Sequence, residues 1–267
     1  MKRIGFIDHY ISEWHANKYP AWLKEAGEAI GEELIVTAVY AEEDTSPVDG
    51  RTTAEWCAAY GARAYGSIEE LCRDVDFLFI LAPDSPEKHL PYANVALPFG
   101  KPTYIDKTFA PSLAVAEEII ALSERYGAPM YSTSPLRYAT ELDGIAPRGF
   151  ETFSGGPHLS DYIVHPLEMI VKVMGCDATV SAVTRTATGC DATLNYPDGR
   201  TAIMHYDPAT SGFAIAADGV RVPIASPFFP RLITDVVRFF FDHTPPFDRA
   251  ETRAVMRLSD EILAKTK

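Results

Sequence analysis

The first 145 residues alternate short apolar runs with amphipathic stretches of helical length. Short apolar runs bounded by turn residues predict buried strands, and apolar residues at helical spacing predict helices that connect them. The predicted strands are Arg3–Ile7, Leu34–Tyr40, Asp76–Leu81, Pro102–Ile105 and Pro129–Ser132. The predicted helices are Trp14–Ile30, Thr53–Tyr60, Ile68–Cys72, Pro86–Leu97 and Leu113–Tyr126. This alternation predicts an α/β domain with a doubly wound, mostly parallel, Rossmann-like sheet.

The pattern changes after about residue 150. One helix is predicted over His158–Met174, and β-branched runs separated by turn residues follow it. The predicted strands are Thr179–Ala187, Ala192–Tyr196, Thr201–Asp207, Gly212–Ala216 and Val220–Ile224, and the last helices are Phe229–Asp242 and Arg249–Lys265. We therefore expect a Rossmann-like domain over residues 1–145 and an α+β domain with a mostly antiparallel sheet over residues 146–267.

Composition excludes several classes of partner. A net charge of −13 over 267 residues argues against nucleic acid and against an anionic membrane surface, since both need clustered Lys and Arg. The four cysteines form no C-x-x-C pair, and reduced thiols are expected. Asp8 and His9 interrupt the first apolar run too early for a signal peptide, and the run near Phe77–Ala82 is too short to span a bilayer. The sequence predicts a soluble, cytoplasmic protein that acts on a small molecule.

Three side chains form the candidate catalytic group. Asp161 and His165 follow the pair Gly155-Gly156 and are four residues apart, so a helix would place them on one face. Lys107 follows a predicted strand, at the sheet edge where ligands collect in open α/β sheets. A cation, a carboxylate and an imidazole together suit hydride transfer on an alcohol. His165 is the candidate general base because its ordinary pKa lies near working pH.

Three motifs in order carry a resemblance to a known family. They are the glycine pair with Asp161 and His165, the run Gly100-Lys101-Pro102-Thr103-Tyr104-Ile105-Asp106-Lys107-Thr108, and the run Leu81-Ala82-Pro83-Asp84 with His89. The chain resembles the glucose-fructose oxidoreductase, inositol dehydrogenase and MocA family of nicotinamide-dependent oxidoreductases.

The resemblance implies a role for each motif. Lys107 would hydrogen-bond the reacting hydroxyl of a sugar, a polyol or a related small molecule, and Asp161 would contact substrate or hold Lys107 and His165 in place. Pro83, Asp84, His89 and Asp106 would contact the cofactor. The resemblance also implies that residues 1–145 bind the dinucleotide, that residues 146–267 form the substrate and oligomerisation domain, and that the protein is a homodimer or homotetramer.

The first turn departs from the dinucleotide pattern. G-x-G-x-x-G normally follows the first strand, but Gly5 lies inside the strand and Asp8-His9-Tyr10-Ile11-Ser12-Glu13 follows it. Asp8 and Glu13 would repel a phosphate, whereas the hydroxyls of Tyr10 and Ser12 and a helix beginning near Ser12 could bind one. We list Asp8, His9, Tyr10 and Ser12 as candidate cofactor contacts. Glu42, after the second strand, would bind the ribose and favour NAD over NADP.

Several alternatives stay open. His158, Asp161, His165 and Glu168 form a helical stripe that could bind a metal, although no second element supplies ligands and no metal is expected. Pro166 would kink a helix over His158–Met174. Arg137 either matches an arginine of the family or pairs with acids between the domains, and the latter is favoured. Trp14, Tyr19 and Trp22 are expected in the core. A regulatory protein that kept the fold but lost the dinucleotide is the second functional hypothesis.

Overall fold

The computed structural model describes residues 1–266, and they form two compact units. The first unit contains residues 1–110, 117–132 and 230–246, and the second contains residues 111–116, 133–229 and 247–266. The sequence predicts a single boundary after residue 145, whereas the observed division crosses the chain several times. Of the helices in residues 1–266, none is long and apolar enough to cross a membrane.

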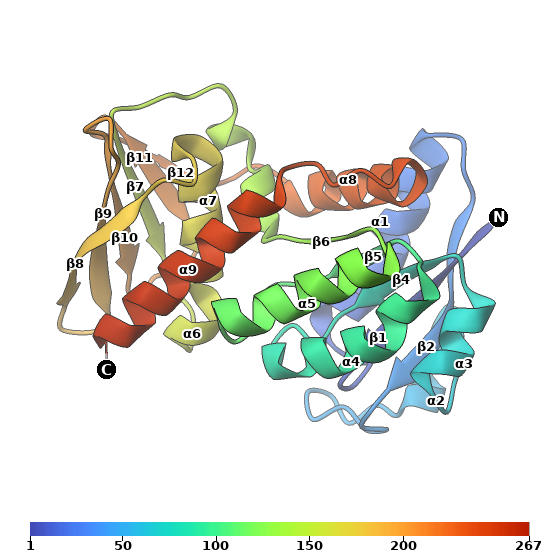
Figure 1. Ribbon diagram of the computed structural model, residues 1–267. Coiled ribbons are helices and arrows are strands. Elements are labelled where there is room, and N and C mark those ends of the chain that lie inside the picture. The colour runs from blue at the N-terminus through green and yellow to red at the C-terminus, as the bar shows by residue number, and fades with distance from the viewer. Residues whose placement is uncertain (267) are drawn as a thin grey trace. The chain divides into compact units, whose positions relative to one another are not determined.

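The first unit is built on a six-stranded parallel sheet in the order β3-β2-β1-β4-β5-β6 (Figure 1). The strands are β1 (Lys2–Asp8), β2 (Leu34–Ala41), β3 (Arg63–Ala64), β4 (Phe77–Ile80), β5 (Thr103–Ile105) and β6 (Met130–Ser132). This order confirms the predicted doubly wound fold. From β1 the chain first adds strands on one side of the sheet, β2 and β3, and then on the other side, beginning with β4. Ligands bind at this switch point between β1 and β4 in such folds.

Five helices connect these strands, and a sixth, from later in the chain, also belongs to this unit. Two 3-10 turns extend one connection, the one between β4 and β5. The helices are α1 (Trp14–Ala29), α2 (Thr53–Tyr60), α3 (Ile68–Asp74), α4 (His89–Ala96), α5 (Leu113–Tyr126) and α8 (Phe228–Asp242). The 3-10 turns are η1 (Pro86–Lys88) and η2 (Leu97–Phe99), on either side of α4. Helix α2 begins at Thr53, as predicted. Thr52 and Glu55 form a capping box that fixes this start.

An aromatic row crosses the first sheet and explains why α8 belongs to this unit. Phe6, Phe79, Tyr104 and Tyr131 occupy matching positions on four neighbouring strands, so their side chains share one face. Tyr19 of α1 contacts this row, and from α8 Phe240 contacts Phe79 and Phe239 contacts Tyr131. Burying these rings holds α8 on the first sheet although it is remote in sequence.

The second unit contains a mostly antiparallel sheet, as predicted, in the order β12-β11-β7-β10-β9-β8. The strands are β7 (Gly149–Ser154), β8 (Thr179–Arg185), β9 (Cys190–Asn195), β10 (Thr201–Tyr206), β11 (Ala214–Ala217) and β12 (Val220–Pro223). The central pair β7 and β10 is parallel. Its helices are α6 (Leu159–Tyr162), α7 (Val164–Met174) and α9 (Arg249–Thr266), with the 3-10 turns η3 (Pro135–Tyr138) and η4 (Thr140–Leu142).

The predicted helix over His158–Met174 is two helices, α6 and α7, that meet at Ile163. Pro166 therefore lies in the first turn of α7, where a missing N–H removes no helical hydrogen bond. The predicted helix is thus interrupted three residues before Pro166, where the structure has two helices in place of one kinked helix.

Candidate active site

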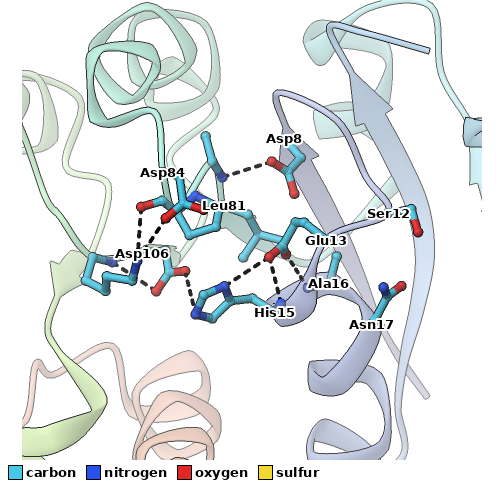
Figure 2. A network of polar contacts seen from close by, with 12 residues as sticks. Asp8, Ser12, Glu13, His15, Ala16, Asn17, Leu81, Asp84 and Asp106 are labelled. Carbon is cyan, nitrogen blue, oxygen red and sulfur yellow. Dashed lines mark hydrogen bonds and ion pairs between the residues drawn. The ribbon is translucent and has the colours of Figure 1, made fainter. Parts of the chain in front are cut away.

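The carboxyl ends of β1, β4 and β5 meet at one edge of the first sheet (Figure 2). Lys107 follows β5 at this edge and is only 6% exposed. Its ammonium nitrogen donates to the carbonyl oxygen of Pro83 at 3.1 Å and lies 3.6 Å from a carboxylate oxygen of Asp84. Because a lysine is seldom buried this far, its ammonium at a ligand-binding edge marks a candidate site.

Asp106, next to Lys107, is fully buried. Its Oδ1 accepts from the backbone N–H of Lys107 at 2.9 Å and from the hydroxyl of Tyr104 at 3.4 Å. Its Oδ2 has no hydrogen-bond partner and lies 3.7 Å from Nε2 of His15. Asp106 thus carries an unsatisfied oxygen beside an imidazole.

Glu13 closes the end of α1 that points to this edge. It is the N-cap residue, and its carboxylate accepts from the backbone N–H of His15 at 2.7 Å and from that of Ala16. The same carboxylate lies 3.0 Å from Nδ1 of His15. The sequence predicts that this helix begins near Ser12, but the cap is Glu13.

His15 and Asp8 complete a buried group of ionisable side chains. Burial lowers the pKa of His15, but the carboxylates of Asp106 and Glu13 outweigh it and raise that pKa overall. Burial, with the nearby charge of Glu13, raises the pKa of Asp8 well above its usual range. Asp8 Oδ1 accepts from the backbone N–H groups of His9 and Ala82, while Oδ2 has no partner. The group therefore favours an imidazolium and a protonated carboxyl.

Two more of the predicted cofactor residues, Ser12 and Glu42, form hydrogen bonds with other side chains of this unit. Ser12 is buried and donates to Asp49 at 2.8 Å. Glu42 accepts from Lys88 and from the hydroxyl of Tyr92, both at 2.6 Å.

Three further predicted contacts lie around the same edge. His89 is fully buried between the carbonyl oxygens of Phe109 and Leu81, at 3.0 and 2.5 Å. His9 and Tyr10 are half-buried, and Nδ1 of His9 lies 3.4 Å from the hydroxyl of Ser85. Their roles toward a cofactor stay predictions.

His165 lies in the second unit, in the first turn of α7, and is 6% exposed. Its Nδ1 lies 2.7 Å from the hydroxyl of Ser134, and the rings of Tyr162 and Phe213 contact its ring edge-on. Asp161, in α6, is half-buried and accepts from the hydroxyl of Ser160 at 2.9 Å. Ser134 orients the imidazole. No local pattern predicts this contact, because Ser134 and His165 are 31 residues apart in the sequence.

The glycine pair before α6 has a packing reason. A β-carbon on Gly155 would collide with the carbonyl oxygens of Asp207 and Thr210, and one on Gly156 would collide with the ring of Tyr162. The pair thus lets the chain pass close to its neighbours on the way to Asp161.

Arg137 is a structural residue of the second unit. Its guanidinium lies 3.2 Å from Glu168, pairs also with Glu251 and stacks over the ring of Phe247. The predicted pairing with acids is confirmed, but these acids belong to the same unit as Arg137.

The other sequence hypotheses have clear outcomes. Residues 1–266 contain no group of three or more His, Cys, Asp or Glu that could hold a metal ion. All four cysteines are free thiols. Tyr19 is fully buried as expected, but Trp14 is 47% exposed, which contradicts its predicted place in the core.

Comparison with known proteins supports the fold. Neither a protein-family model nor a curated protein matches the sequence. Solved structures do match over nearly the whole chain. The dehydrogenase MviM from Clostridium difficile is 17% identical with a TM-score of 0.74, and the match covers 98% of this chain and 99% of that chain. The chain has the fold of the glucose-fructose oxidoreductase, inositol dehydrogenase and MocA family. The predicted resemblance is confirmed at this level.

Two further matches were solved with bound molecules. The WlbA dehydrogenase from Thermus thermophilus, in complex with NAD and UDP-GlcNAcA, is 17% identical with a TM-score of 0.74, over 100% of this chain and 95% of that chain. KijD10, a 3-ketoreductase from Actinomadura kijaniata in complex with NADP and TDP-benzene, is 16% identical with a TM-score of 0.73, over 99% and 97%. These structural neighbours are therefore oxidoreductases that bind NAD or NADP.

The residues of the first unit fit a dinucleotide at one end and not at the other. Lys107 and Asp106 lie at the carboxyl edge of β5, where a reacting group would sit. A pyrophosphate needs free N–H groups at the start of α1, and the Glu13 carboxylate already accepts from them. The phosphate half of a dinucleotide would therefore have to compete with the Glu13 carboxylate for these N–H groups.

Proposed function

We propose that this protein is an oxidoreductase that acts on a carbon-bound hydroxyl or carbonyl of a sugar, a polyol or a related small molecule. The observation that carries this proposal is the buried ammonium of Lys107 at the carboxyl edge of the parallel sheet. The family fold supports it, as do the dehydrogenase and ketoreductase activities of the structural neighbours.

Lys107 is the proposed electrophile. Its ammonium is held by the carbonyl of Pro83 and lies near Asp84, whose side chain is 65% exposed. A positive charge held in a mostly buried position stabilises negative charge on a substrate oxygen more strongly than a solvated one does. Lys107 would therefore bind the reacting oxygen and stabilise its alkoxide character.

His165 is the proposed general acid and base. Its contact with Ser134 fixes the ring orientation, which a positioned base requires. Asp161 lies one helical turn before it and is proposed to orient the substrate or the catalytic pair. These assignments rest on the motif and on the placement of each side chain within its own unit.

We propose NAD rather than NADP as the cofactor. The acidic run Glu42-Glu43-Asp44 follows β2, where the adenine ribose lies in Rossmann-like folds, and it would repel a 2′-phosphate. A homo-oligomer and a cytoplasmic location stay predictions from the sequence.

Steady-state turnover tests the function. The purified protein would be assayed on a panel of sugars, polyols and nucleotide sugars, with NAD, NADH, NADP and NADPH. Lys107→Ala should lower kcat by roughly 100- to 1000-fold, the usual effect of removing one preorganised donor. Lys24→Ala removes an exposed lysine of α1 and should leave kcat unchanged. If kcat falls equally in both variants, or if it falls in neither, Lys107 has no part in the mechanism.

The second candidate is a ligand-binding or regulatory protein with a degenerate dinucleotide site. The Glu13 cap favours it, because the turn that normally receives a pyrophosphate holds a carboxylate. Titration with NADH and NADPH, followed by energy transfer from Trp14 and Trp22, separates the two functions. Absent turnover together with no binding at millimolar cofactor would favour the regulator.

A further inference from the structure

All three glycine positions of the dinucleotide turn carry side chains in this chain. Counted from the end of β1, a G-x-G-x-x-G turn would have glycine at residues 8, 10 and 13, which are Asp8, Tyr10 and Glu13. The second glycine normally lets the backbone approach the pyrophosphate, and the third lets the helix pack closely on the strand. None of these functions is available to the turn as it stands.

Glu13 uses the hydrogen-bond donors that a phosphate would use. The first N–H groups of a helix have no partner within the helix and form an anion site. In α1, the N–H groups of His15 and Ala16 both donate to the Glu13 carboxylate, which is 6% exposed (Figure 2). The anion at this helix end is therefore part of the protein.

A second set of contacts covers the same turn. Ser46 donates to the carbonyl oxygen of Ser12 at 2.6 Å, and Ser12 donates to Asp49 at 2.8 Å. Both serines are buried. The segment around Ser46 and Asp49, which follows β2, thus lies against the β1–α1 turn and adds another carboxylate there.

Asp8 gives an independent indication that the turn is closed to anions. It occupies the first glycine position, is 1% exposed, and its Oδ2 has no hydrogen-bond partner. A phosphate at this turn would meet the Asp8 side chain where a glycine normally leaves space, and it would approach the Glu13 carboxylate. Steric exclusion by Asp8 and charge repulsion by Glu13 both oppose that approach.

We propose that the Glu13 carboxylate is a built-in substitute for the cofactor's pyrophosphate, so that a dinucleotide binds this chain weakly and binds tightly only when that carboxylate is displaced or removed. The inference rests on the proposed function only in naming a dinucleotide as the ligand. The new element is that the Glu13 carboxylate limits the affinity for that ligand, which cannot be read from the fold alone.

Equilibrium binding of ADP-ribose tests the inference without any turnover. ADP-ribose carries the pyrophosphate but no nicotinamide, so its affinity reports on the phosphate half of the site. Calorimetry would compare the wild type with Glu13→Ser, which keeps a good helix cap but removes the charge and opens space. We expect Glu13→Ser to bind about tenfold more tightly or better, as loss of one short-range repulsion predicts.

Two further variants make the result specific. Glu28→Ser removes an acid from the last turns of the same helix, so it changes net charge equally and should alter affinity by less than about twofold, because the charge is distant and exposed. Glu13→Gln keeps an oxygen that can accept from the helix N–H groups. It should give a smaller gain, and it serves as the test if Glu13→Ser does not fold.

The outcomes separate this inference from the proposed function. Wild-type protein that binds ADP-ribose as tightly as both Glu13 variants would overturn the inference, even if turnover depends on Lys107. Tighter binding by the Glu13 variants with no turnover in any assay would support the inference and overturn the function. Equal gains in Glu13→Ser and Glu28→Ser would reduce the effect to net charge and also overturn the inference.

Discussion

The two units bury charged groups in opposite ways. In the second unit Arg137 lies between Glu168 and Glu251, and Glu168 also accepts from Thr133 and Ser134. In the first unit Asp8 and Asp106 each keep one buried oxygen without a hydrogen bond. A satisfied buried network serves structure, whereas buried polar atoms left unsatisfied are costly and are typical of functional sites. Among the buried charged groups, the comparison therefore favours a structural role for the network around Arg137 and a functional role for the acids beside Lys107.

The largest expected effect lies in the second unit. Arg137→Ala would leave Glu168 buried without its cation and should lower the free energy of unfolding by about 3–5 kcal/mol. Urea denaturation followed by circular dichroism measures this loss. Arg238→Ala is the matched control, because that side chain is 64% exposed and pairs with Asp235 on the surface. It should cost no more than about 0.5 kcal/mol. Similar losses in the two variants would contradict the structural role of Arg137.

The second prediction concerns Asp8 and the pH dependence of stability. The pKa of Asp8 is raised in the folded state, so above its ordinary value of 3.8 the folded protein keeps a proton that the unfolded chain has released. Wild-type stability should therefore fall relative to Asp8→Asn as pH rises above 3.8, by at most about 1.4 kcal/mol per pH unit, until the folded pKa is passed. Urea midpoints over a pH series measure the difference.

Asp198→Asn is the control for Asp8. Hydrogen bonds from the backbone N–H and side chain of Arg200 lower the pKa of this exposed carboxyl, so its pH dependence has the opposite sign. If the difference in unfolding free energy between wild type and Asp8→Asn does not change with pH, the pKa of Asp8 is not raised in the folded protein.

The smallest effect is expected at His15. Its pKa is raised above the ordinary 6.5, so its contribution to stability is fully present below pH 6.5 and is lost as pH rises through the folded pKa. The advantage of wild type over His15→Gln should shrink across that range in the same urea series. His158→Gln, at an exposed histidine, is the control for the effect of the His-to-Gln change itself. An advantage that grows with pH would reverse the assignment of His15 as a cation.

Local patterns predicted most helices and strands. The helices over Thr53–Tyr60 and Leu113–Tyr126 have the predicted bounds, because caps and stop glycines act within a few residues. Strand β7 was missed since its buried face includes Thr152 and Ser154, which break the apolar alternation that marks a strand. In the site, Lys107 was identifiable from its place after a strand, whereas the contacts of Glu13 and His15 were not.

The sequence by itself determined the doubly wound first domain, the place of Lys107 after β5 and the absence of glycine from the first turn, because periodicity and spacing act locally. Only the tertiary structure decided that α8 packs on the first sheet, that Arg137 pairs within the second unit and that Glu13 caps α1. Ser12, a predicted cofactor contact, donates to Asp49, 37 residues away. Such choices depend on which groups meet when distant segments pack, and local sequence pattern does not specify them.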